Sequence, residues 1–392
     1  MAVHFSPPGS GRGSGASCRG TGPALWYDLR MAQRTEESLG PAGAGRFLIV
    51  GLPGNAPGKL PEIKDFLDTV EPLGVVLFER NLPDLRSTLE LTEALLGWRQ
   101  DLVVAIDHEG GRVHRLPPPF TRFPPALVMA RSGNPGLIRE AARAQARELR
   151  AAGIDVNFAP VLDIHTNPDN PVIGDRAFGT TPEEVVHHAL PYLQGLAEGG
   201  VLGCGKHFPG HGDTSCDSHV QLPRVEHEAD RLRAVEMAPF ARAVEQGVAM
   251  IMTAHVLFPA LDPERPASLS APVIDGILRR IYGFGGMVVS DDLNMGAITG
   301  SYSVADSAVA AIAAGSDAVL VCQDPDSAVS ARDALQRAIE EGHLPPDLVQ
   351  ASDRRRARFF KRVRRMRRIE VDRSWIGADA HRRLAEQLAQ PR

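Results

Sequence analysis

The sequence predicts an α/β fold, in which eight parallel strands and their connecting helices form a single (β/α)8 TIM barrel. Three observations carry this prediction: short apolar runs recur from residue 46 onward, stretches with helical spacing separate them, and ionisable residues gather after the runs. Alternating strand and helix patterns favour parallel strands with right-handed crossovers. Eight such repeats over residues 46–325 suit a closed barrel, which typically needs roughly 250 residues.

The predicted strands are short apolar runs, each followed by a polar or glycine-rich corner. In chain order they are Phe47–Leu52, Gly74–Phe78, Leu102–Ile106, Ile154–Phe158, Val201–Gly205, Val248–Thr253, Met287–Ser290 and Ala318–Val321. Between them, Pro135–Ala152, Pro182–Gly199 and Ser303–Gly315 have the spacing and composition of helices. An open doubly wound sheet is the alternative, but no Gly-x-Gly-x-x-Gly follows the first run.

Both ends of the chain differ from the barrel region, residues 45–345. Residues 1–44 are rich in Gly, Ser, Pro and Arg without apolar periodicity, so we expect a disordered extension. Residues 346–392 form a predicted basic helical segment that packs on the barrel. Its stretch 351–368 carries ten Arg or Lys and one acid, with apolar residues at helical spacing. We expect these arginines to face water; a membrane surface or nucleic acid is the alternative partner.

The overall composition, 43% hydrophobic and 23% charged, is ordinary for a soluble globular protein. A net charge of −5 gives no general attraction to nucleic acid. Four cysteines without CxxC spacing suit a reducing compartment. No segment approaches the length of a membrane span, and the first residues lack the pattern of a secretory signal. We therefore expect a cytoplasmic monomer that binds neither nucleic acid nor a bilayer.

Ionisable residues follow the predicted strands repeatedly, whereas the opposite ends carry mostly glycine and unremarkable polar residues. The groups in question are Asp107–Arg112, Asn157–Asp163 with Asp175 and Arg176, Lys206 and His207, His255, and Asp291 with Asp292. Active sites of TIM barrels lie at the carboxyl ends of the strands. We therefore expect these residues to form one site.

The segment Lys206–His219 holds three histidines, two aspartates and a lysine after a buried strand. In Asp217-Ser218-His219, the carboxylate lies two residues from the imidazole and can fix its tautomer and stabilise its charged form. Gly210 and Gly212 would let the loop hinge, so that a mobile donor approaches bound substrate. A solvated polar turn is the plain alternative.

Several of these residues match the sequence motifs of a known enzyme family. Lys206–Gly212 followed by Asp217–His219 resembles the signature of the β-N-acetylglucosaminidase branch of glycoside hydrolase family 3. Five other pieces match in order, namely Asp107–Arg115, Asn157–Asp163, Gly174–Gly179, Met252–His255 and Ser290–Met295. The likeness covers residues 46–325. One small departure is Ala177, where most relatives have serine.

The resemblance implies a retaining exo-β-N-acetylglucosaminidase that works by double displacement without a cofactor or metal. Asp291 would be the nucleophile, with Asp292 as its chemical rival. His219 would be the general acid/base, with Asp217 as its partner. The residues that would bind the non-reducing N-acetylglucosamine are Asp107, Arg115, Arg176, Lys206 and His207. Plainer roles remain: Asp107 and Arg176 as a structural ion pair, His207 as a satisfied buried histidine, and Arg115 as a brace for its loop.

The short stretch after residue 321 leaves no room for the C-terminal sandwich domain of many family members. The chain is therefore similar to the single-domain branch, whose members release N-acetylglucosamine from 1,6-anhydro-muropeptides during cytoplasmic peptidoglycan recycling. Alternatives are a β-N-acetylglucosaminide phosphorylase, a related family 3 β-glycosidase, and an inactive carbohydrate-binding barrel. A metal-dependent barrel hydrolase is a further alternative, with ligands from His207, His211, Asp213, His219 and Asp291.

Overall fold

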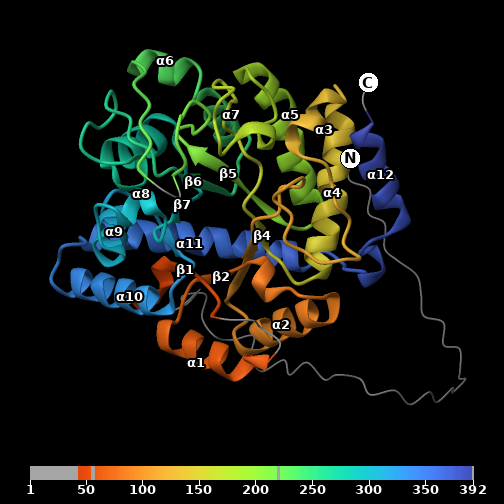
Figure 1. Ribbon diagram of the computed structural model, residues 1–392. Coiled ribbons are helices and arrows are strands. Elements are labelled where there is room, and N and C mark those ends of the chain that lie inside the picture. Colours follow the sequence, from red (N-terminus) through yellow and green to blue (C-terminus); the bar gives the residue numbers. More distant parts are fainter. Residues whose placement is uncertain (1–42, 54–57, 219–220, 391–392) are drawn as a thin grey trace, which may run out of the picture. The chain divides into compact units, whose positions relative to one another are not determined.

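A closed barrel of eight parallel strands forms the centre of the chain (Figure 1). The computed structural model describes residues 43–53, 58–218 and 221–390. The strands are β1 (Leu48–Gly51), β2 (Gly74–Leu77), β3 (Val103–Ile106), β4 (Val156–Asn157), β5 (Leu202–Phe208), β6 (Met250–Thr253), β7 (Met287–Asp292) and β8 (Ala318–Val321). Each strand pairs with the next in sequence, and β1 pairs with β8. The predicted (β/α)8 barrel and its eight strands are confirmed.

Two strands run further than the sequence indicated. β5 ends at Phe208 and β7 ends at Asp292, so Lys206, His207 and Asp291 lie in the last residues of strands and not in the loops beyond. Pairing continues past an irregularity in each strand, between Gly205 and Phe208 in β5 and between Val289 and Asp292 in β7. Bulges of this kind re-aim side chains beside active sites. The polar residues therefore remain strand residues while leaving the regular ladder.

Helices occupy the connections between the strands, and η2 (Ala44–Phe47) precedes β1 while α10 (Pro325–Glu340) follows β8. The longer connecting ones are α1 (Leu60–Val70), α2 (Leu85–Trp98), α4 (Pro135–Ala151), α5 (Pro182–Glu198), α7 (Ala238–Glu245), the π-helix η7 (Pro272–Ile281) and α9 (Val304–Ala313). The short ones are η4 (Glu79–Asn81), α3 (Ala126–Arg131), η5 (Gly174–Arg176), α6 (Ala229–Ala234), η6 (Ala267–Leu269) and α8 (Gly296–Thr299). Several helices begin at a capping side chain: Asp84 accepts from Ser87 N, and Asn134 accepts from Leu137 N.

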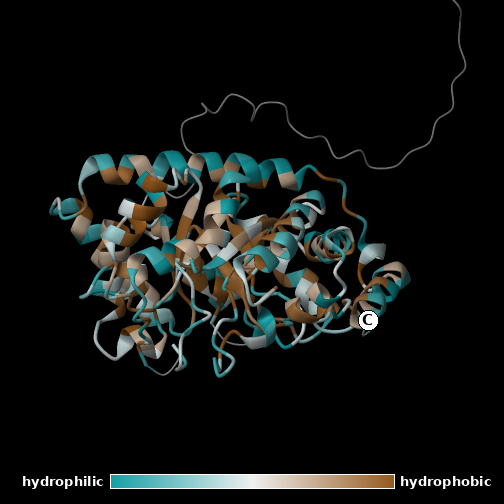
Figure 2. Ribbon diagram, turned by 90° about the horizontal axis from the view of Figure 1, so that it is seen from above, coloured by the Kyte–Doolittle hydropathy of each residue, from teal (hydrophilic) through white to brown (hydrophobic). Residues whose placement is uncertain are grey.

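The basic C-terminal helix α11 (Pro346–Arg367) runs across the amino-terminal end of the barrel (Figures 1 and 2). Its Phe359, Phe360 and Val363 join the cluster of side chains that fill the barrel, among them Met250 and Met287. After α11, the chain continues through η8 (Arg373–Trp375) to α12 (Asp379–Ala389). Among the described helices, none is long and apolar enough to cross a membrane.

The amino-terminal end of the barrel is more highly charged than the sequence suggested. Asp155 precedes β4 and Asp317 precedes β8, and both side chains are at most 1% exposed. Arg367 of α11 pairs with Asp155 at 2.6 Å, and Arg355 pairs with Asp317 at 2.7 Å. The expectations of unremarkable polar residues here and of arginines facing water were thus wrong in part. A buried carboxylate needs a cationic partner, and α11 supplies it.

Candidate active site

A cavity of about 500 Å³ opens at the carboxyl ends of the strands. We call it the mouth cavity. It is lined by Phe78, Arg80, Asp107, Arg115, Asp291, Asp292, Met295, Leu320, Cys322 and Gln323. Three of the predicted site residues, Asp107, Arg115 and Asp291, therefore border one space. This is the end of the barrel at which the sequence predicted the site.

A cluster of four ionised groups lies beside the mouth cavity. Lys206 Nζ is 2.5 Å from Asp107 Oδ1 and 2.7 Å from Glu109 Oε1. Arg176, from η5, donates to both oxygens of Glu109, from Nε at 2.8 Å and from Nη2 at 2.7 Å. The sequence allowed an ion pair between Asp107 and Arg176. The structure has three pairs in its place, Asp107–Lys206, Lys206–Glu109 and Glu109–Arg176. Asp107 is the most exposed residue of the cluster, with 23% of its side chain accessible to solvent.

Burial opposes the charged form of each inner member of this cluster, but the opposite charges outweigh it. The pKa of Glu109 is held well below its usual range by Arg176 and Lys206. The pKa of Lys206 is raised by Asp107 and Glu109. Both groups therefore stay ionised at neutral pH. The cluster is a network of charge-assisted hydrogen bonds that borders the cavity through Asp107.

His207 is fixed by a buried carboxylate on the neighbouring strand connection. Its Nδ1 is 2.7 Å from Asp163 Oδ2, and its backbone N–H donates to Asp163 Oδ1 at 3.1 Å. The backbone N–H of His211 also donates to Asp163, at 2.7 Å. Asp163 thus satisfies the Nδ1 and the backbone N–H of His207, whereas Nε2 bonds to no described residue. The predicted role of His207 in binding substrate stays a prediction.

Asp291 and Asp292 are adjacent carboxylates at the end of β7 with different surroundings. Burial opposes ionisation of Asp291, but the neighbouring His207 and His255 and the N–H of Asp292 lower its pKa. Burial raises the pKa of Asp292 to about 6, although Asp292 Oδ1 accepts hydrogen bonds from the N–H groups of Asn294 and Cys322. Asp291 is thus the ionised carboxylate and Asp292 is tied to the backbone of the neighbouring strand end.

The first part of the loop after β5 is anchored to the barrel. Gly212 lies so close to Ile164 that an added Cβ would stand 1.6 Å from its carbonyl oxygen. His211 contacts the hydroxyls of Thr214 and Ser218 at 2.9 and 3.0 Å, and burial lowers its pKa to about 4. Gly212 therefore permits close packing here, whereas the sequence suggested a hinge.

The end of this loop reaches the strand end that carries Asp291. The carbonyl oxygen of Ser218 accepts a hydrogen bond from the N–H of Ala297 at 3.0 Å, two residues beyond the cavity-lining Met295. Asp217 is partly buried in the same stretch. His219, the predicted acid/base, lies outside the described residues.

Arg115 meets the cavity from the long loop after β3. Its backbone N–H donates to Nδ1 of the buried His108 at 3.2 Å. Burial lowers the pKa of His108 well below its usual value, so this imidazole is neutral and accepts. The Nε of Arg115 is buried without a described partner. The backbone of Arg115 is therefore anchored to His108, and its Nε keeps unused donor capacity.

Several residues of the site have roles that the sequence did not indicate. Glu109 and Asp163 were quoted as motif residues without a role, although they position Lys206, Arg176 and His207. Asp107 and Glu109 are two residues apart directly after a strand, and this spacing was the available signal. Phe78, Arg80 and Gln323 also line the cavity. The sequence did not predict them, because nothing in their spacing distinguishes them from other loop residues.

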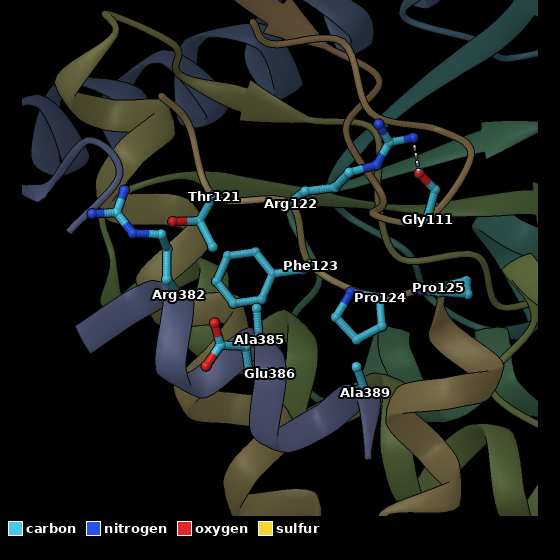
Figure 3. Close-up of a pocket in the computed structure, with 10 residues that line it drawn as sticks. All are labelled: Gly111, Thr121, Arg122, Phe123, Pro124, Pro125, Arg382, Ala385, Glu386 and Ala389. Carbon is cyan, nitrogen blue, oxygen red and sulfur yellow. Dashed lines mark hydrogen bonds between the residues drawn. The ribbon is translucent and has the colours of Figure 1, made fainter. Parts of the chain in front are cut away.

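A second cavity, of about 460 Å³, lies between α12 and the segment Thr121–Pro125 (Figure 3). Phe123, Pro124 and Pro125 face Ala385 and Ala389 there. Its lining holds a single carboxylate, Glu386, at its edge. Hydrolysis of a glycosidic bond uses two protein groups. One transfers protons, and the other attacks the anomeric carbon or activates water. The mouth cavity, with the three aspartates Asp107, Asp291 and Asp292, is therefore the better candidate. Among the described residues, no three His, Cys, Asp or Glu side chains gather as a metal site would require.

Comparison with known proteins identifies the family of this barrel. The family described as "Glycosyl hydrolase family 3 N terminal domain" matches residues 61–359. The chain belongs to glycoside hydrolase family 3. As a family 3 member it is an enzyme, a glycoside hydrolase.

The proteins similar to this family 3 hydrolase include a curated sequence relative and two solved structures. The Beta-hexosaminidase of Methylococcus capsulatus is 41% identical over 268 residues, which is 67% of this chain and 79% of that protein. A family 3 beta-N-acetylglucosaminidase structure from Paenibacillus sp. str. FPU-7 is 37% identical with a TM-score of 0.83, covering 88% of this chain and 67% of the other. The structure of NagZ from Neisseria gonorrhoeae in complex with N-trifluoroacetyl-D-glucosamine is 33% identical with a TM-score of 0.73. The match covers 90% of this chain and 99% of NagZ.

Proposed function

We propose that the chain is a retaining exo-β-N-acetylglucosaminidase whose site is the mouth cavity. The observation that carries this proposal is that Asp291, an ionised carboxylate, shares the cavity with Asp107 and Arg115 beside the Lys206–Glu109–Arg176 cluster. A retaining glycosidase needs a nucleophilic carboxylate beneath a sugar that is held by fixed polar groups. The names of the relatives support N-acetylglucosamine as that sugar.

The charged cluster would hold the non-reducing sugar. Asp107 accepts hydrogen bonds from two hydroxyls, while Lys206, Arg176 and His207 Nε2 donate to others. Because Glu109 and Asp163 already fix these donors, the sugar meets groups that need little reorganisation. Arg115 Nε supplies a further donor.

Asp291 would act as the nucleophile. Its carboxylate oxygen attacks the anomeric carbon as the bond to the leaving oxygen breaks, forming a covalent glycosyl-enzyme. A water molecule then attacks the same carbon and releases Asp291. The lowered pKa of Asp291 favours the ionised, nucleophilic form, whereas Asp292 is occupied by the N–H groups of Asn294 and Cys322.

His219 would carry the proton, with Asp217 as its partner. The imidazolium gives its proton to the leaving oxygen in the first step, and the imidazole takes one from water in the second. Support comes from Ser218, the residue directly before His219, whose carbonyl oxygen is hydrogen-bonded beside Met295 of the cavity wall. This part of the proposal rests on the family motif Asp217-Ser218-His219 together with that anchor.

The substrate that we propose is a 1,6-anhydro-muropeptide, a peptidoglycan fragment with a non-reducing N-acetylglucosamine. The reaction would then take place in the cytoplasm during cell-wall recycling. The likeness to the NagZ structure over nearly its whole length supports this choice, because it extends to the single-domain branch of the family.

Proton NMR of the first turnovers on 4-nitrophenyl N-acetyl-β-D-glucosaminide tests the proposal. We expect β-N-acetylglucosamine as the initial product, at a rate unchanged by inorganic phosphate or a chelator. Initial release of the α-anomer would show inversion. A sugar 1-phosphate would identify a phosphorylase, and loss of activity in chelator would identify a metal-dependent hydrolase.

A further inference from the structure

A third cavity lies at the amino-terminal end of the barrel, opposite the mouth cavity. We call it the basal pocket. Ala249 and Gly286, the residues directly before β6 and β7, border it, and α11 forms its outer wall. Its volume is about 290 Å³, and its lining is Val244, Gly247, Val248, Ala249, Gly283, Phe284, Gly285, Gly286, Arg355, Arg358, Phe359 and Arg362. Nothing in the proposed hydrolysis uses this space.

Three guanidinium groups enter the basal pocket from one face of α11. Arg355, Arg358 and Arg362 are spaced three and four residues apart, so they stand in one row. Arg355 pairs with the buried Asp317, which also pairs with Arg279 at 2.6 Å. Among the described carboxylates, none pairs with Arg358 or Arg362. The pocket therefore carries excess positive charge, and Asp317 is already shared between two arginines.

The remaining walls combine apolar rings with free backbone donors. Phe284 and Phe359 line the pocket with Val244 and Val248. Arg279 Nη1 donates to the carbonyl oxygens of Phe284 and Gly286 at 2.9 and 2.7 Å, which fixes the turn Gly283–Gly286. The space beside Gly283 and Gly285 is open where a Cβ would stand. The N–H groups of Gly285 and Gly286 donate to no described residue.

We propose that the basal pocket binds a phosphate group attached to a small apolar or lipid moiety. Guanidinium groups match phosphate oxygens in bidentate geometry, and Arg358 and Arg362 are the two without a carboxylate. Exposed cations of α11 outside the pocket, among them Arg354, Lys361 and Arg365, raise the local potential for any anion. The adjoining Phe284 and Phe359 suit the group that carries the phosphate. This site is independent of the hydrolase proposal.

Calorimetric titration of the full chain with phenyl phosphate, and flotation with phosphatidylglycerol or phosphatidylcholine vesicles, test the site. The two probes distinguish the two possible ligands. Binding of phenyl phosphate would indicate a soluble phosphate ester, and binding to phosphatidylglycerol vesicles would indicate a lipid headgroup. The variant is Arg358→Glu with Arg362→Glu. Its matched control is Lys361→Glu with Arg365→Glu, which makes the same charge change on the same helix outside the pocket.

We expect saturable binding to at least one probe, weakened tenfold or more in the pocket variant and less than threefold in the control variant. Hydrolase activity should be unchanged in both, because the pocket lies at the opposite end of the barrel. Equal weakening in the two variants would overturn the proposal in favour of diffuse attraction to α11. Absence of saturable binding by the unmodified chain to either probe would also overturn it.

Discussion

Glu109 links the two cations that would hold the sugar. Its oxygens contact Lys206 and Arg176 at once, and its side chain is 7% exposed. Burial makes these charges depend on one another. A buried charge lowers the stability of the fold when its partner is removed, because it then lacks a counter-charge. Glu109 is therefore a positioning residue, and Asp107, the more exposed carboxylate, is left to contact the substrate.

Replacing Glu109 with glutamine removes a charge while keeping the side chain's shape. We expect the free energy of unfolding to fall by about 3–5 kcal/mol, because two buried cations lose a counter-charge. KM should rise at least tenfold. Urea unfolding and steady-state kinetics measure both effects. Asp175→Asn is the control, since its pair with Arg112 is about half exposed and should contribute only about 0–1 kcal/mol. Unchanged stability of Glu109→Gln would contradict this account.

Asp292 gives the site a pH-dependent stability. Its folded pKa of about 6 lies above the unfolded value of about 3.9, so the unfolded chain loses this proton first as pH rises. The stability that Asp292 contributes is full below about pH 3.9 and is lost as pH rises through about 6.

The substitution Asp292→Asn should remove this pH dependence while keeping an Oδ1 acceptor for Asn294 and Cys322. Relative to the unmodified chain, the variant should gain about 1–2 kcal/mol of stability between pH 5 and pH 7.5. Thermal or urea unfolding at the two pH values measures the difference. A stability difference that does not change with pH would show that Asp292 titrates normally.

Elements on opposite ends of the barrel do different work. At the carboxyl ends, irregular pairing in β5 and β7 turns Lys206, His207 and Asp291 toward the site. At the amino ends, α11 closes the barrel with apolar side chains and sends arginines to Asp155 and Asp317. The loops that border the mouth cavity thus lie opposite an end of the barrel that buried ion pairs hold together.

Asp317→Ala tests how much that end depends on α11. Arg279, Arg355, Ser352 and the N–H of Val288 would all lose an acceptor. We expect a loss of about 3–5 kcal/mol in unfolding free energy. Asp333→Ala on α10, whose carboxylate is 46% exposed and pairs with Arg332, should cost about 0–1 kcal/mol. Equal losses in the two variants would mean that burial of Asp317 does not matter.

The sequence predicted the presence of each barrel strand more accurately than the residue at which the strand ends. Apolar periodicity marks where a strand is buried, so all eight strands were found. It stops at the first polar residue, so the last residues of β5 and β7 were taken as loop. The paired aspartates of the amino-terminal end were missed for a related reason. Asp155 and Asp317 look like ordinary loop acids until the fold brings distant arginines to them.

For the whole molecule, motif spacing predicted which residues gather at the carboxyl ends of the strands but could not give the pairings among them. Asp107, Arg115 and Asp291 do border one cavity. The partner of Arg176 proved to be Glu109, because which carboxylate faces a given guanidinium depends on loop geometry. The roles of Asp291, His219 and Asp217 in catalysis stay predictions.

Azide rescue of Asp291→Ala tests the central claim, that Asp291 is the nucleophile of a retaining enzyme. With the carboxylate removed, azide can occupy its place and attack from the same face, so an activated aryl N-acetyl-β-glucosaminide should give the α-glycosyl azide. His219→Ala keeps the nucleophile and should instead give the β-glycosyl azide. If Asp291→Ala gives the β-azide, or if Asp292→Ala and not Asp291→Ala gives the α-azide, then Asp291 is not the nucleophile.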